Sequence, residues 1–159
     1  MQQETVEGFR LSPQQRRVWS LRDGGTALRA QCSLLLRGEL RAGALKEAAR
    51  RLVGQHDILR TTFHLLPGMR FPVQSVGGRV EFGWREVDLT AGATGGARAA
   101  EVGELWRSEL GRPFDFEGEP PLRLVLAALS ASEHLLVVSL PSLCADSWTL
   151  KSFVRQLAA

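Results

Sequence analysis

The sequence is poor in cysteine and histidine and has no long hydrophobic run, and each shortage excludes a class of protein. Cys32 and Cys144 lie far apart without histidines at metal-ligand spacing, which argues against a disulfide framework and against a zinc site. No apolar run reaches the roughly 18 residues that a membrane span requires. Residues 1–10 are polar and lack the basic start and apolar stretch of a secretory signal. These absences favour a cytoplasmic protein with two reduced thiols and no membrane partner.

Lysine is also scarce, occurring only at Lys46 and Lys151, so nearly all of the 20 basic residues are arginine. They face 17 acids, which gives a net charge of +3. A nucleic-acid-binding protein would gather its arginines in one stripe with aromatics between them, whereas these are scattered from Arg10 to Arg155. We therefore expect no nucleic-acid partner. With 159 residues, 44% of them hydrophobic, the chain is long enough for one globular domain with a real core.

Apolar residues recur at helical spacing in four segments. Ser12 is the expected N-cap of the first helix, Gly54 is expected to end the second, and Asp146 or Ser147 caps the last. The predicted helices cover residues 12–21, 42–53, 97–110 and 147–157.

Six shorter segments have the composition of strands, at residues 30–36, 58–65, 71–76, 84–89, 122–129 and 134–140. The three from 58 to 89 follow one another and are expected to form a sheet. The last two are expected to form a hairpin whose second strand is buried on both faces. This order predicts a single α/β lobe in which helices pack against a mixed sheet.

Two stretches resemble motifs of the condensation domains of nonribosomal peptide synthetases, which have the chloramphenicol-acetyltransferase-like fold. Residues 11–21, LSPQQRRVWSL, are similar to the family's opening Ser-x-x-Gln-x-Arg-x-Trp-x-Leu. Residues 55–63, QHDILRTTF, are similar to its Arg-His-Glu-x-Leu-Arg-Thr-x-Phe, and residues 111–123 weakly resemble its Pro-Phe-Asp turn before a Pro-Leu-x-Arg strand. The resemblance corresponds to the N-terminal lobe of a two-lobed fold. It implies that residues 1–159 are one such lobe, facing the second lobe of the same domain or another copy of the chain.

The family's His-His-x-x-x-Asp-Gly motif has its counterpart here in residues 141–147, PSLCADS. Asp146 matches, whereas both histidines and the glycine are replaced. The resemblance implies that the second histidine assists attack of an acceptor amine on a donor thioester, and Ser142 holds its position. A hydroxyl becomes a base or nucleophile only beside a neighbouring base, which the sequence does not identify. Cys144 has no predicted cationic neighbour that would lower its thiol pKa, so a catalytic thiol is not expected.

The resemblance also implies a structural pair between Asp146 and Arg60 that holds the loop against the sheet, because a buried carboxylate requires a neutralising partner. The alternative is that Asp146 is only a helix N-cap and that Arg60 lies in solvent.

Three functions follow from the resemblance. The leading one is a catalytically degenerate condensation-like lobe that acts as a docking or interface module for carrier-bound intermediates in peptide natural-product biosynthesis. The second is part of a longer, active acyltransferase that forms amide bonds from carrier-bound thioesters without the usual histidine. The third is a free-standing oligomeric interaction protein. In the first two the partner is a peptidyl-carrier domain with its phosphopantetheine arm, and no cofactor binds the chain directly.

Overall fold

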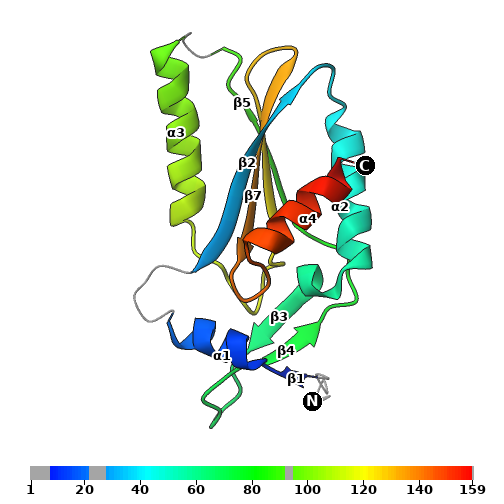
Figure 1. Ribbon diagram of the computed structural model, residues 1–159, viewed down its shortest axis with the longest axis vertical. Helices are drawn as coiled ribbons and strands as arrows, with labels where there is room; N and C mark the ends of the chain where they lie inside the picture. Colours follow the sequence, from blue (N-terminus) through cyan, green and yellow to red (C-terminus); the bar gives the residue numbers. More distant parts are fainter. Residues whose placement is uncertain (1–7, 22–27, 92–94, 159) are drawn as a thin grey trace.

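The computed structural model describes residues 8–21, 28–91 and 95–158 (Figure 1). The helices are α1 (Pro13–Ser20), α2 (Ala42–Gln55), α3 (Gly96–Gly111) and α4 (Ser147–Leu157), with a short 3-10 helix η2 (Asp57–Arg60). The strands are β1 (Phe9–Arg10), β2 (Arg29–Arg37), β3 (Thr61–His64), β4 (Val73–Val76), β5 (Gly83–Asp88), β6 (Arg123–Ala128) and β7 (Glu133–Pro141).

The larger sheet has the strand order β2-β7-β6-β5 and is mixed, as predicted. β7 pairs antiparallel with both β2 and β6, whereas β5 is parallel to β6 and is joined to it through α3. Figure 1 shows α3 on one face of this sheet and α2 with α4 on the other. A smaller sheet, β1-β4-β3, lies with α1 beyond one end of the larger one.

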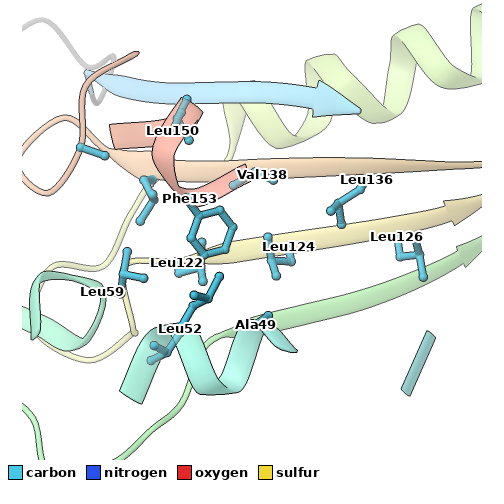
Figure 2. Packing of buried hydrophobic residues seen from close by; sticks show 13 residues of the cluster. Ala49, Leu52, Leu59, Leu122, Leu124, Leu126, Leu136, Val138, Leu150 and Phe153 are labelled. Atoms are coloured by element: carbon cyan, nitrogen blue, oxygen red, sulfur yellow. The ribbon is translucent and has the colours of Figure 1, made fainter. Parts of the chain in front are cut away.

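The core follows from the alternation of side chains along the two central strands. Leu124 of β6 and Val138 of β7 face α2 and α4, where they pack with Phe153 (Figure 2). Val125 and Val137 point the opposite way and pack against α3. β7 is therefore buried on both faces, as predicted. Each large apolar side chain buried in this way contributes about 1.5–3 kcal/mol.

The structure corrects three predicted elements. The segment predicted as one strand from residue 58 begins instead as η2. The hydroxyl of Thr61, the first residue of β3, donates to the Asp57 carbonyl of η2 at 2.8 Å. The helix predicted to end at Gly54 continues to Gln55, because the backbone first becomes extended at His56. The strand predicted to follow β3 and β4 in their sheet, β5, belongs to the larger sheet. Local composition does not reveal which partner a strand will find.

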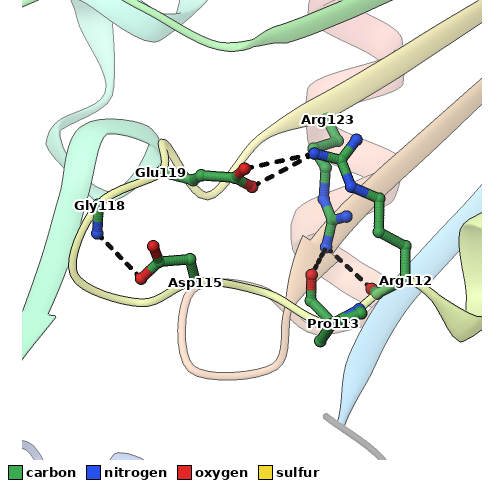
Figure 3. Close-up of polar contacts among 6 residues, drawn as sticks. All are labelled: Arg112, Pro113, Asp115, Gly118, Glu119 and Arg123. Atoms are coloured by element: carbon green, nitrogen blue, oxygen red, sulfur yellow. Dashed lines mark hydrogen bonds and ion pairs between the residues drawn. The ribbon is translucent and has the colours of Figure 1, made fainter.

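Two arginines from the larger sheet close the C-terminal end of α3. Arg29 donates to the carbonyl oxygens of Glu109 and Arg112, at 2.6 and 2.9 Å. Arg123 donates to the carbonyls of Arg112 and Pro113, at 3.2 and 3.1 Å (Figure 3). The last carbonyls of a helix have no partner within it and carry partial negative charge, so cations there are favourable.

The connection from α3 to β6 is held by local contacts. The Arg123 guanidinium lies 3.8 Å from the centre of the Phe114 ring. Burial, followed by the charge of Arg112, lowers the pKa of Arg123 to about 10, which leaves it charged at neutral pH. Asp115 accepts from the backbone N–H of Gly118 at 3.0 Å and forms the turn before β6 (Figure 3).

Candidate functional site

Residues 142–146, which the sequence resemblance aligns with the family's histidine motif, form the loop between β7 and α4, and backbone hydrogen bonds hold this loop in place. The N–H groups of Cys144 and Ala145 both donate to the Pro141 carbonyl, at 2.8 and 3.1 Å. The N–H of Ser142 donates to the Leu28 carbonyl at 2.8 Å, which continues the pairing of β2 with β7. These bonds fix where the Ser142 side chain emerges.

Helix α1 supports this loop from the side through Gln15. The Gln15 side chain accepts from the N–H of Ser12, whose own side chain accepts from the N–H of Gln15, so the two form a capping box. The amide nitrogen of Gln15 also donates to the Gln74 side chain and to the Leu143 carbonyl, each at 3.1 Å. One side chain thus joins α1, β4 and the loop. The sequence analysis did not identify this role, although Gln15 is the glutamine of the opening motif.

A pocket of about 420 Å³ opens beside the loop, and we refer to it as the loop pocket. Most of its side chains offer hydroxyl, amide or carboxylate groups, and the rest are apolar. Its lining residues are Ser12, Gln14, Gln15, Ile58, Gln74, Ser142, Leu143, Cys144, Ala145, Asp146 and Thr149. Ser142, the residue that the sequence resemblance aligns with the missing histidine, is part of this lining, and residues of α1, β4 and α4 contribute the other walls.

None of the three histidines lines the loop pocket. His56 lies against α4, where its Nε2 is 2.7 Å from the Gln156 side chain. The Nε2 of His64 forms a hydrogen bond with the hydroxyl of Thr62 at 2.8 Å. His134 lies at the other end of β7 from the loop. No imidazole therefore lines the loop pocket itself, whereas His56 lines the apolar groove that adjoins it between η2 and α4.

Neither of the two titratable side chains of the loop is available for proton transfer: Asp146 is hydrogen-bonded and Cys144 is buried. The Asp146 carboxylate caps α4, accepting from the backbone N–H and the hydroxyl of Thr149 at 2.8 and 2.9 Å. These bonds, the backbone one first, hold the pKa of Asp146 below its usual value. Cys144 is buried, and burial raises the pKa of its thiol. It therefore remains a neutral thiol at physiological pH, which makes it a poor nucleophile.

The predicted pair between Arg60 and Asp146 is not formed. Arg60 donates to the Gly77 carbonyl at 2.6 Å and forms an ion pair with Asp57, three residues earlier. Asp146 is satisfied by Thr149, as the alternative N-cap interpretation predicted. The same alternative placed Arg60 in solvent, which is wrong because the Arg60 side chain is only 22% exposed. Both groups find local partners, so neither requires the other.

A smaller, apolar groove of about 230 Å³ continues from the loop pocket between η2 and α4. The two share Ile58 and Thr149. Trp148, which follows the loop directly, lines this groove and is 74% exposed.

Within the described ranges, no three His, Cys, Asp or Glu residues gather as metal ligands would. No helix in the described part of the chain is long and apolar enough to cross a membrane.

Solved condensation domains have the same architecture. The chain superimposes on the starter condensation domain of rhizomide synthetase RzmA with a TM-score of 0.79 and 16% identity, covering 94% of this chain and 36% of that one. The first condensation domain of the calcium-dependent antibiotic synthetase gives a TM-score of 0.82 and 19% identity, with 95% and 36% covered. The fold is therefore that of a condensation domain, of the chloramphenicol-acetyltransferase-like type.

The sequence matches the family model of the Condensation domain over residues 6–159, and the chain belongs to this family of nonribosomal peptide synthetase domains. It is 34% identical over 152 residues to chondramide synthase cmdD of Chondromyces crocatus, covering 94% of this chain and 4% of that protein. It is 32% identical over 152 residues to the isonitrile lipopeptide synthase of Mycobacterium tuberculosis, covering 94% and 6%. The chain thus spans only a small part of these synthetases.

Proposed function

We propose that the chain is the N-terminal lobe of a condensation domain that positions carrier-bound intermediates of a peptide synthetase without supplying a general base. The observation that carries this proposal is the placement of Ser142 in the loop pocket, together with the absence of any histidine from its lining. Residues 1–159 would then form one lobe, with the second lobe of the same domain or another copy of the chain opposite.

The chemistry of the lining supports positioning over proton transfer. An imidazole accepts a proton near neutral pH, whereas an unassisted hydroxyl only donates and accepts hydrogen bonds. Asp146 is engaged in capping α4, and Cys144 is a buried thiol with a raised pKa. The amides and hydroxyls of the pocket suit a ligand that carries amide and hydroxyl groups of its own.

Such a ligand is the phosphopantetheine arm of a peptidyl-carrier domain, which we propose as the partner. The relatives of this chain are peptide synthetases, and the arm would enter from the carrier rather than bind as a resident cofactor. The degenerate lobe would then act as a docking or interface module.

The alternative is an active acyltransferase in which proximity replaces the base. Holding an amine against a thioester can lower the barrier by about 7–11 kcal/mol without proton transfer from the protein. The loop pocket, at about 420 Å³, has room for a substrate, as this alternative requires.

A condensation assay separates the two. The full-length protein is supplied with an acyl-loaded donor carrier and an aminoacyl-loaded acceptor carrier, and amide product is measured by mass spectrometry beside carrier binding. We expect carrier binding without product in the wild type. Product that falls about tenfold or more in Ser142→Ala would overturn the positioning proposal.

Ser147→Ala is the matched control. It removes the same hydroxyl five residues further along, from an exposed serine outside the loop pocket. If Ser142→Ala and Ser147→Ala reduced product equally, the loss would not report on the pocket. Absence of carrier binding would contradict the docking role itself.

A further inference from the structure

A second groove, separate from the loop pocket, lies among β1, α1 and the connection between β3 and β4. Three of its seven lining residues are arginines and none is acidic. We refer to it as the arginine groove; its lining residues are Arg10, Leu11, Arg16, Met69, Arg70, Phe71 and Pro72, and its volume is about 210 Å³. It shares no lining residue with the loop pocket.

The three guanidinium groups come from three different elements. Arg10 belongs to β1, Arg16 to α1, and Arg70 to the connection between β3 and β4. All three are exposed, and none forms an ion pair with a carboxylate among the described residues. In a protein whose net charge is only +3, three neighbouring cations of this kind are a marked local excess.

Phe71 restrains two of these groups. The guanidinium carbon of Arg16 lies 5.7 Å from the centre of the Phe71 ring, and that of Arg70 lies 5.3 Å from it. Stacking on one ring limits the rotamers that a long side chain explores and leaves the N–H groups free for a ligand. The groove is therefore partly organised for binding before any ligand arrives.

We propose that the arginine groove binds a phosphate group. An arginine presents N–H donors in a planar fork that matches the oxygens of phosphate or carboxylate. A carboxylate has two oxygens, whereas a phosphate has enough to engage three guanidinium groups from different directions at once. Inorganic phosphate and a phosphate ester displayed by a partner share this chemistry. The proposal does not depend on the function proposed above for the loop pocket.

The test is a titration of the chain with inorganic phosphate by calorimetry, at constant ionic strength adjusted with sodium chloride. We expect saturable binding that weakens about tenfold or more in the double variant Arg16→Gln/Arg70→Gln. The matched control is Arg37→Gln/Arg51→Gln, which removes the same two charges from exposed side chains of β2 and α2. We expect the control to bind within about twofold of the wild type.

Lack of saturable binding to the wild type, or an equal loss in both double variants, would overturn the proposal. An equal loss of affinity would mean that phosphate binding depends only on the net charge of the protein. Melting temperatures of the two double variants verify that both remain folded, which is expected because all four arginines are exposed.

A peptidyl-carrier domain, compared with and without its phosphopantetheine arm, identifies the source of the phosphate. Tighter binding of the form with the arm, lost in Arg16→Gln/Arg70→Gln, would assign the groove to the phosphate of the arm. Equal binding of the two forms, with inorganic phosphate still bound, would assign it to free phosphate.

Discussion

Glu109 of α3 is an acid in the interior, with a side chain only 3% exposed. Its carboxylate is stabilised by Arg85 of β5, whose guanidinium nitrogen lies 2.6 Å from the carboxylate oxygen. Removing the cation would leave a buried charge without its partner, which costs more than the pair itself contributes. The Arg37–Glu133 pair, at 3.2 Å, has side chains 74% and 43% exposed and is screened by water.

We expect Arg85→Ala to lower the free energy of unfolding by about 2 kcal/mol, and Glu109→Gln to restore part of that loss in the same background. Urea denaturation measures both. Arg37→Ala is the control, with an expected cost below about 0.5 kcal/mol. Equal costs for the two arginine variants would contradict a special role for the buried carboxylate.

At the scale of single residues, the sequence predicted that Ser142 follows a strand and offered the N-cap role of Asp146 as an alternative, but it did not predict the partner of Arg60. Ser142 follows a strand whose register is determined by its apolar pattern, so its place at the strand end was predictable. The partner of Arg60 was not, because Asp57 and the Gly77 carbonyl satisfy it locally. A resemblance identifies which residues match, but it does not establish which neighbours they contact.

Helices α1 and α4 each begin with a side-chain cap, and both caps lie at the loop pocket. Ser12 caps α1 and Asp146 caps α4. The sequence predicted Ser12 and left Asp146 or Ser147 open for α4, since N-cap preferences are local and both residue types favour this position. Gln15 adds a contact that only the fold creates, because its amide reaches β4 and the loop at once.

The cap of α4 predicts a dependence of stability on pH. Bonds from Thr149 lower the pKa of Asp146 in the folded state, so the stabilisation is complete above the ordinary aspartate pKa of about 3.9 and is lost as the pH falls through the lowered value. Asp146→Asn keeps an acceptor for the cap but does not titrate. We therefore expect the melting temperature of the wild type to fall more steeply between about pH 5 and pH 2 than that of the variant.

Glu39→Gln serves as the control, because Glu39 is exposed and its replacement removes the same charge elsewhere. Its pH profile should follow that of the wild type. Parallel profiles for Asp146→Asn and the wild type would show that the cap does not contribute through its charge.

In the whole molecule, a separate apolar cluster joins the smaller sheet and α1 to the loop. Phe63 of β3, 1% exposed, packs with Leu11, Trp19, Leu143 and Cys144 in this cluster. The loop therefore takes part in two units, since the core of the larger sheet lies on its other side. Disrupting this cluster should therefore unfold α1 and the smaller sheet more readily than the larger sheet.

We expect Phe63→Ala to cost about 3 kcal/mol and to reduce amide protection mainly in α1, β3 and β4. Hydrogen–deuterium exchange read by mass spectrometry measures this distribution. Leu136→Ala, in the fully buried centre of the main core, should instead reduce protection throughout β6 and β7. Identical exchange patterns for the two variants would mean that the molecule unfolds only as one unit.

The sequence by itself determined the helices, most strands, the mixed α/β class and the lack of histidine in residues 141–147, because each depends on local periodicity, capping or residue identity. Only the tertiary structure decided that β5 joins the larger sheet, that Arg60 pairs with Asp57 rather than with Asp146, and that Arg10, Arg16 and Arg70 surround one groove. These features depend on which distant segments meet. That choice is made by packing of the whole chain, which no local pattern encodes.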